Sequence, residues 1–197
     1  ALTENIADIN AALASLRSGE SALQNLVTQH GLTKVHLYMK LLKNSAFEAL
    51  KNVLTPFQNQ LFTASEALDD GHEINVSITR SQSDLDFDFT GCSSRHPNNL
   101  NANISIIYSA ILYVLRLLVN QNIPLNEGLM QGVKIILPDD SFLHPVFSDD
   151  ATQCPAVVGG NTEVSQRLVD TLLKAFGLAS CSQGTMNNFL FGSTGFG

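Results

Sequence analysis

The stretch SQGTMNNF, Ser182 to Phe189, gathers amide and hydroxyl side chains around a glycine, with no charge, histidine or cysteine. Such side chains donate and accept hydrogen bonds, but they do not abstract protons at neutral pH. They suit the orientation of an amide or carboxylate and the stabilisation of an oxyanion. The alternative is a turn network without a ligand, because serine and asparagine readily bond their own backbone.

A second polar stretch, GGNTEVSQR, runs from Gly159 to Arg167. Its two glycines allow close backbone approach or unusual dihedral angles. Asn161 or Thr162 can cap a following helix, whose free N–H groups then face whatever lies in front. Glu163 falls in the first turn, where the helix dipole already favours a carboxylate. The pattern is equally compatible with a plain helix start and with an amide and a carboxylate presented to a polar substrate or a neighbouring catalytic segment.

The segment DLDFDF, Asp84 to Phe89, places three carboxylates on one face of a predicted strand, about 6 to 7 Å apart. A hard cation could bridge them if other oxygens converged. A solvated acidic face that protects an edge strand explains the pattern more simply. We therefore assign no metal ligand in this chain.

Three other residues attract attention. The five histidines show no metal-ligand spacing, and only His96, beside Asn98 and Asn99, has polar neighbours. Arg116 interrupts an apolar run, where a buried guanidinium needs a carboxylate or carbonyl oxygens; we favour a structural ion pair. Cys181 has no assured histidine partner, so no nucleophile–base pair is visible.

Helical periodicity dominates the first quarter of the chain. Apolar residues recur at three- and four-residue steps from Ile6 to Leu16, with a predicted break or kink at Ser18-Gly19. The pattern continues to about His30-Gly31, and a further helix runs from Val35 until Pro56 ends it. We therefore predict a helical N-terminal arm over residues 1–56.

From residue 57 onward the apolar period changes to two and predicts strands around Ile74–Ile78 and Leu85–Phe89. Further elements are predicted in this order: a loop over 91–103, an apolar helix over 103–120, a strand over 133–137, a loop over 139–160 and a helix over 162–176 ended by Gly177. The helix over 103–120 is apolar nearly all round, which predicts burial. The order of elements predicts an α+β fold, with a mixed helix and strand core over residues 57–197.

The composition is that of a globular chain of 197 residues, with 44% hydrophobic and 15% charged residues. A net charge of −7 and scattered Lys and Arg argue against nucleic acid and against anionic membrane surfaces. No apolar run reaches the length of a membrane span, about 20 residues. Three cysteines without metal spacing, and no signal peptide, favour the cytoplasm. Because the chain begins without Met and stops at GSTGFG, we expect an internal piece of a longer polypeptide.

Three long motifs make the chain recognisable: IPLNEG from Ile123, PAVVGGNTEVSQRLVD from Pro155 and ASCSQGTMNN from Ala179. Shorter pieces occur in the same order, namely DIN, HLYM, DFTG, NNLNA and LYVLRLLV. Together they resemble the hydantoinase B/oxoprolinase family over almost the whole chain.

The resemblance implies a hydrolase of cyclic amides, an ATP-dependent enzyme that opens 5-oxoproline or hydantoin rings. In that family a hydantoinase A-like, kinase-like subunit or domain phosphorylates the lactam oxygen, and the B part completes the hydrolysis. The resemblance therefore implies a small-molecule lactam substrate, ATP and a divalent metal for the full-length system, and an oligomeric assembly. Two alternatives stay open: a subunit of an acetone or acetophenone carboxylase, and a module that only assembles subunits through its helices.

The family's metal-binding stretch and its glycine-rich C-terminal part have no counterpart here. We therefore expect this fragment alone to bind no cofactor and to be inactive. Seven polar residues match the family motifs and are expected to line the substrate site or to support it: Asn98, Asn101, Asn161, Glu163, Gln183, Asn187 and Asn188.

Overall fold

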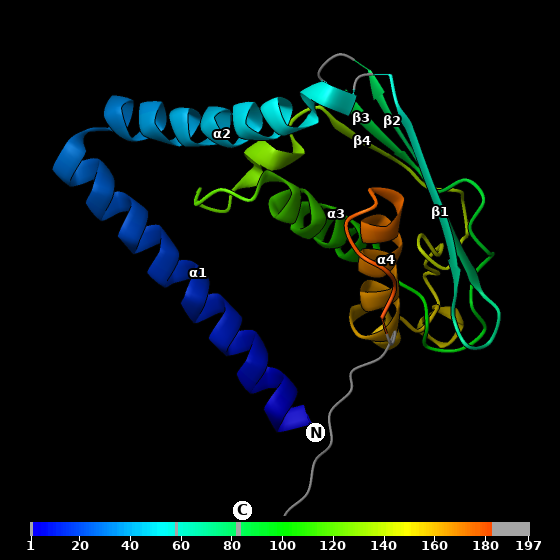
Figure 1. Cartoon of the computed structure of the whole chain (residues 1–197). Helices are drawn as coiled ribbons and strands as arrows, with labels where there is room; N and C mark the ends of the chain where they lie inside the picture. Colours follow the sequence, from blue (N-terminus) through cyan, green and yellow to red (C-terminus); the bar gives the residue numbers. More distant parts are fainter. Residues whose placement is uncertain (1, 58, 82–83, 183–197) are drawn as a thin grey trace, which may run out of the picture. The chain divides into compact units, whose positions relative to one another are not determined.

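The computed structural model describes residues 2–57, 59–81 and 84–182. The chain divides into two units, Ala1–Ser45 and Ala46–Gly197. The boundary between them falls within the helix Leu32–Leu54. Figure 1 shows the order of the elements along the chain. The domain boundary expected at residue 56 stays a prediction, although a helix does end just before Pro56.

The first unit is helical. It contains α1 (Leu2–His30) and the beginning of α2 (Leu32–Leu54), joined at Gly31, whose φ of 81° requires glycine. The predicted break at Ser18-Gly19 is wrong, because α1 runs through both residues. A glycine inside a helix costs only about 1 kcal/mol, which the flanking helix-forming residues outweigh. No described residue of α1 is buried.

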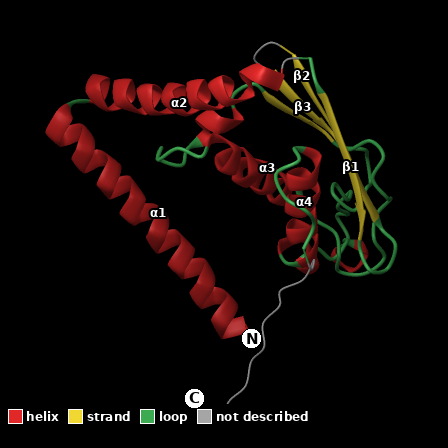
Figure 2. Ribbon diagram, viewed as in Figure 1, coloured by secondary structure: helices red, strands yellow, loops and turns green. Residues whose placement is uncertain are grey.

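The second unit contains a four-stranded sheet in the order β1-β2-β3-β4 (Figure 2). Its strands are β1 (Leu61–Ala67), β2 (Glu73–Ser81), β3 (Asp84–Asp88) and β4 (Val133–Ile136). The first two pairings are antiparallel and the third is parallel. The α+β class and the three predicted strand regions are confirmed. The strand β1 was not predicted: LFTASEA buries only one large apolar side chain, Phe62, so its apolar alternation is weak.

The helices α3 (Ile104–Val119) and α4 (Glu163–Ala175) pack against each other, and α4 also contacts β1 and β2. The core joins the inward side chains of β2 and β3 to the buried faces of these helices and of the last part of α2. Short 3-10 turns occupy the connections: η1 (Thr55–Phe57), η2 (Glu127–Met130), η3 (Ala151–Gln153) and η4 (Val158–Asn161).

Local signals place the ends of α3 and α4 correctly. The Asn103 side chain accepts the Ser105 N–H at 3.0 Å, and Asn120 adopts a left-handed conformation at the other end of α3. Gly177, with φ of 67°, follows α4 as predicted.

The predicted burial of α3 is confirmed for one face only. Ile107, Ile111 and Leu115 are fully buried, whereas Tyr113 is 54% exposed and Leu117 45%. An apolar pattern all round a helix does not specify which faces find a neighbour, and in the second unit α4 and η2 cover only part of the surface of α3.

Candidate functional site

Two of the motif segments meet through their backbones. The Gly159 N–H donates to the carbonyl oxygen of Asn99 at 2.8 Å. A Cβ atom added to Gly159 would lie 2.5 Å from a methyl carbon of Leu100, and one added to Gly160 would lie 2.4 Å from the carbonyl oxygen of Asn101. Both glycines therefore serve close approach rather than an unusual dihedral angle. The contact places the NNLNA loop against the turn that precedes α4.

Asn101 holds this junction from inside. It is fully buried, and its Oδ1 accepts the backbone N–H of His96 at 2.8 Å. Its Nδ2 group donates to the carbonyl oxygens of His96, Asn98 and Ala156, each at 3.0 Å. The amide side chain thus ties the loop to the segment before Gly159, and it has no donor or acceptor turned toward solvent.

The structure brings four of the seven predicted site residues to this junction. Asn98 and Asn161 flank the contact and are exposed, and Glu163 is half-buried in the first turn of α4. Asn161 also borders an open groove of about 360 Å³ between α3 and α4, which includes Tyr113 and Gln166. Gln183, Asn187 and Asn188 lie outside the described residues.

The expected side-chain cap of α4 is absent at Thr162. Its backbone occupies the N-cap position, but the side chain makes no capping bond there. The Thr162 hydroxyl donates instead to the carbonyl oxygen of Gly159 at 3.4 Å. The Thr162 hydroxyl therefore points back toward Gly159 and not toward the first N–H groups of α4.

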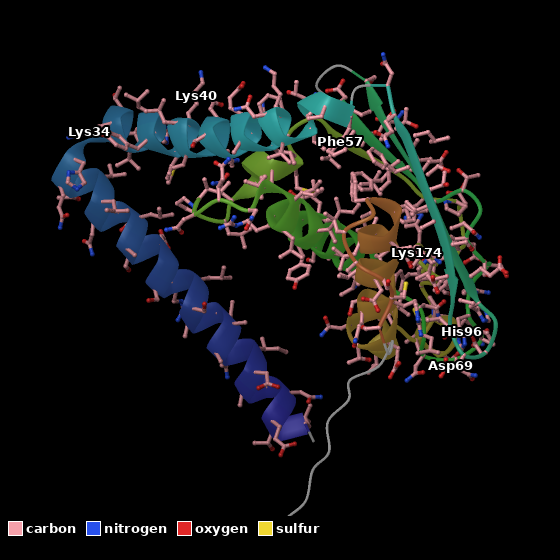
Figure 3. The ribbon with its side chains drawn as sticks, in the orientation of Figure 1. Lys34, Lys40, Phe57, Asp69, His96 and Lys174 are labelled. Carbon is pink, nitrogen blue, oxygen red and sulfur yellow. The ribbon has the colours of Figure 1, made fainter. Side chains whose placement is uncertain are left out.

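A cluster that the sequence analysis missed adjoins the same loop. The Asp70 Oδ2 atom contacts Nε2 of His96 and lies 3.1 Å from Nδ1 of His72. The two imidazole rings are 4.4 Å apart, and the His96 side chain is almost fully buried. Figure 3 shows His96 and Asp69, the neighbour of Asp70, at the same end of the sheet. Only folding joins this turn after β1 to the loop after β3, so spacing gave no signal.

The ligand atoms of Asp70, His72 and His96 lie within 4.8 Å of one another, which is close enough for a metal ion. The tautomer of His96 opposes one. Its Nδ1 accepts the Asn98 N–H at 2.9 Å, so in the neutral ring the proton is on Nε2 and is donated to Asp70. A metal-binding histidine needs a free lone pair on one nitrogen and normally donates from the other. The side chains of Asp70, His72 and His96 therefore fit a hydrogen-bonded cluster that links two loops better than they fit a metal centre.

Hydrogen bonding controls the charge of Asp70. Partial burial acts to raise its pKa, but the hydrogen bonds from the His72 backbone and from the side chains of His96 and His72 outweigh that effect. The pKa of Asp70 is therefore below its ordinary value, and the carboxylate stays ionised at neutral pH.

The structure also bears on two further sequence-based interpretations, a cation at the carboxylates of Asp84–Asp88 and an ion pair at Arg116. Within residues 2–57, 59–81 and 84–182, the carboxylates of β3 join no cluster of metal-ligand type, so a cation gains no support there. The ion pair proposed for Arg116 is wrong. Its guanidinium donates to the carbonyl oxygens of Gln121 and Ile123, which follow the end of α3.

A second polar cluster joins β1, α4 and the segment that leads to Gln183. Lys174 forms an ion pair with Glu66, which lowers the pKa of Glu66 and raises that of Lys174. The Cys181 thiol also hydrogen-bonds to Glu66, and burial together with this bond raises the pKa of Cys181 to about 11. Cys181 is therefore a neutral thiol at physiological pH and not a nucleophile. A hollow of about 570 Å³ on the adjacent strands includes Lys174 but none of the predicted site residues.

The chain is similar to known proteins over almost its whole length. The hydantoinase B/oxoprolinase family model matches residues 1–196. The chain is 36% identical over 212 residues to 5-oxoprolinase 1 of Arabidopsis thaliana, a match that covers 100% of this chain and 16% of that relative. The chain thus spans less than a fifth of the relative's length.

Two solved structures share the fold. The ATP-dependent caprolactamase from Pseudomonas jessenii has a TM-score of 0.68 at 21% identity, covering 85% of this chain and 30% of that one. A nucleotide-free acetone carboxylase has a TM-score of 0.58 at 13% identity, covering 78% of this chain and 22% of that one. Among the helices that the structure describes, none has both the length and the apolar character of a membrane span.

Proposed function

The chain belongs to the hydantoinase B/oxoprolinase family, and we propose that it forms one wall of the active site of an ATP-dependent hydrolase that opens cyclic amides. The substrate class is a lactam such as 5-oxoproline or a hydantoin. The similarity to a 5-oxoprolinase and the fold shared with a caprolactamase support this class.

The observation that carries the proposal is the backbone contact between Gly159 and Asn99. It brings the loop that carries the exposed Asn98 to the turn that carries the exposed Asn161, and this turn directly precedes Glu163 in the first turn of α4. Amide groups can donate to a lactam oxygen and accept from a lactam N–H without changing protonation state. In the proposal these residues orient the substrate, while Asn101, Gly159 and Gly160 hold the junction that carries them.

The remaining chemistry belongs to other parts of the system. Within the described residues, the one candidate metal cluster does not fit a metal ion, so no step is assigned to a metal here. ATP, a divalent metal and a hydantoinase A-like partner would act from sequence outside this chain, in an oligomeric assembly. The proposal includes a cytoplasmic setting, supported by the free thiols of Cys92, Cys154 and Cys181.

Two rival functions each have a supporting observation. The fold shared with an acetone carboxylase favours a carboxylase subunit. The exposed apolar side chains of α1, including Ile9 at 62% and Leu16 at 71%, favour a module that assembles subunits.

The test uses the full-length protein with its kinase-like partner. We expect ATP-dependent ring opening of 5-oxoproline, a hydantoin or caprolactam. The measurement is the amount of ring-opened product, separated by chromatography. Carboxylation of acetone with ATP and labelled bicarbonate, without ring opening, would support the carboxylase subunit instead. If the protein shows neither ring opening nor carboxylation, the assembly module is the function that remains. We expect the 197-residue chain alone to turn over no lactam.

The site residues are tested by kinetics in the same protein. Glu163→Gln and Asn161→Ala should each lower kcat/KM about 10-fold or more. The unfolding midpoint should be unchanged in Asn161→Ala and should fall only slightly in Glu163→Gln, because the Glu163 carboxylate also interacts with the helix dipole of α4. Glu48→Gln is the matched control, because Glu48 is an exposed helix carboxylate paired with Lys51. Wild-type kinetics for both site variants would remove these residues from the site.

A further inference from the structure

We propose that Asp70 and His96 are positioning residues of the candidate site: Asp70 fixes the tautomer of His96, and the His96 ring then holds the backbone of Asn98. The pair thus determines where the exposed Asn98 amide lies at the junction. The effect on lactam turnover rests on the function proposed above, whereas the hold on Asn98 is tested without it.

The local sequence His96-Pro97-Asn98 favours a bond from the ring to the backbone. Proline has a fixed φ of about −65° and no backbone N–H, so the first donor after His96 is the N–H of Asn98. Nδ1 of the imidazole accepts this N–H at 2.9 Å. The arrangement resembles an Asx turn, in which a side-chain acceptor bonds the N–H two residues later, with a ring nitrogen in place of the oxygen.

Asp70 determines which ring nitrogen can accept. It lies in the turn between β1 and β2, and its Oδ2 atom contacts Nε2 of His96. A carboxylate only accepts hydrogen bonds, so Nε2 carries the proton, and in the neutral ring Nδ1 keeps its lone pair. The other oxygen of Asp70 accepts the His72 N–H at 3.1 Å, which holds the carboxylate in place. The His96 side chain is only 4% exposed, so little water competes for either nitrogen.

The backbone of Asn98 is also held at its carbonyl group. Its oxygen accepts Nδ2 of Asn101 at 3.0 Å, and the same amide group donates to the carbonyl oxygen of Ala156. The Asn101 bonds tie Asn98 to the segment before Gly159, and the His96 bond ties it to the turn after β1. Because the backbone is fixed on both sides before a ligand arrives, the exposed Asn98 side chain loses less freedom when it binds one.

The hold on Asn98 is tested by hydrogen exchange at the Asn98 amide in the full-length protein. His96→Ala should accelerate this exchange about tenfold or more, because the amide loses its acceptor. Two further variants separate the two ring nitrogens. His96→Asn places an oxygen near the position of Nδ1 and should restore most of the protection, whereas His96→Gln reaches toward Asp70 instead and should not. His144→Asn, at an exposed histidine outside the cluster, is the matched control.

The role of Asp70 is tested by a double-mutant cycle on the same exchange rate. Asp70→Ala should accelerate exchange at Asn98 about threefold or more, because no carboxylate then keeps the proton on Nε2. In the His96→Asn background the same change should add nothing, since an amide side chain has no tautomer for Asp70 to select. Asp69→Ala, at the exposed neighbouring position, should leave the exchange unchanged.

The functional part is tested by the kinetics of lactam ring opening. His96→Ala should lower kcat/KM about tenfold or more, and His96→Asn should recover most of the loss. In an Asn98→Ala background His96→Ala should cost less, because no amide is left to position. A purely structural role of His96 would give neither the rescue nor the dependence on Asn98.

Two kinds of result would overturn the inference. Unchanged exchange in His96→Ala, or equal protection in His96→Asn and His96→Gln, would refute the hold on Asn98. The comparison of the last two variants decides this point even if His96→Ala does not fold. Restored protection in His96→Asn with kcat/KM still low, or equal losses with and without the Asn98 side chain, would refute the positioning role. If the protein opens no lactam, the proposed function fails, and the exchange experiments still decide whether Asp70 and His96 hold Asn98.

Discussion

The amide nitrogen of Gly159 lies 2.8 Å from the carbonyl oxygen of Asn99, and this backbone bond joins the two motif segments from which the candidate site is built. Neither segment has a charged group at the contact. Backbone contacts and the buried Asn101 amide therefore hold the junction, and the exposed Asn98 and Asn161 side chains lie on either side of it.

Gly160→Ala should destabilise the protein by about 1–3 kcal/mol, because the added methyl group would overlap the backbone of Asn101 and Ala102. The measurement is the urea midpoint of unfolding. Gly19→Ala is the matched control: nothing lies within 4 Å of its added Cβ in α1, so stability should rise by about 0.5–1 kcal/mol. Equal midpoints for the two variants would contradict the close contact.

Asn101→Ala should cost about 2–4 kcal/mol, since it leaves the His96 N–H and three carbonyl oxygens without their buried partner. Asn98→Ala, at an exposed position in the same loop, should change stability by less than about 0.5 kcal/mol. Thermal and urea unfolding of both variants would check the difference. A mild effect of Asn101→Ala would mean that water replaces the lost bonds.

Asp70 predicts a loss of stability in acid. Its pKa is lower in the folded chain than the ordinary value, so its contribution is present above the unfolded pKa of about 4 and is lost as pH falls through the folded pKa. Asp70→Asn should therefore flatten the fall of the urea midpoint between about pH 5 and pH 3. Asp69→Asn, at the neighbouring position outside the histidine cluster, is the control. Parallel curves for Asp70→Asn and the wild type would refute the linkage.

Cys181 should react slowly with iodoacetamide. A pKa of about 11 against the ordinary 9.0 leaves about a hundredfold less thiolate at neutral pH. Glu66→Gln should speed labelling, because it removes the negative charge beside the thiol. Mass spectrometry of the labelled peptides reports Cys181 separately from Cys92 and Cys154. Labelling of Cys181 at the rate of the unfolded chain would contradict its contact with Glu66.

Predictions from sequence succeeded where the signal is local. The alternation around Ile74–Ile78, the stop at Gly177 and the helix that starts after Asn103 were all correct. Each depends on the conformational preferences of a few neighbouring residues. The failures at Gly19 and β1 concern weak local signals, which a long helix or strand pairing overrides.

The amino-acid sequence by itself determined the α+β class, most of the elements and the motifs that identify the family, because periodicity and turn residues act over short stretches. Only the tertiary structure decided which polar groups are hydrogen-bonded inside the protein and which are exposed. It buried Asn101 as an internal tie, joined Asp70 to His96 and placed Ser182 on Asp170. The physical reason is that hydrogen-bond partners far apart in sequence are chosen by packing, and spacing along the chain carries no record of that choice.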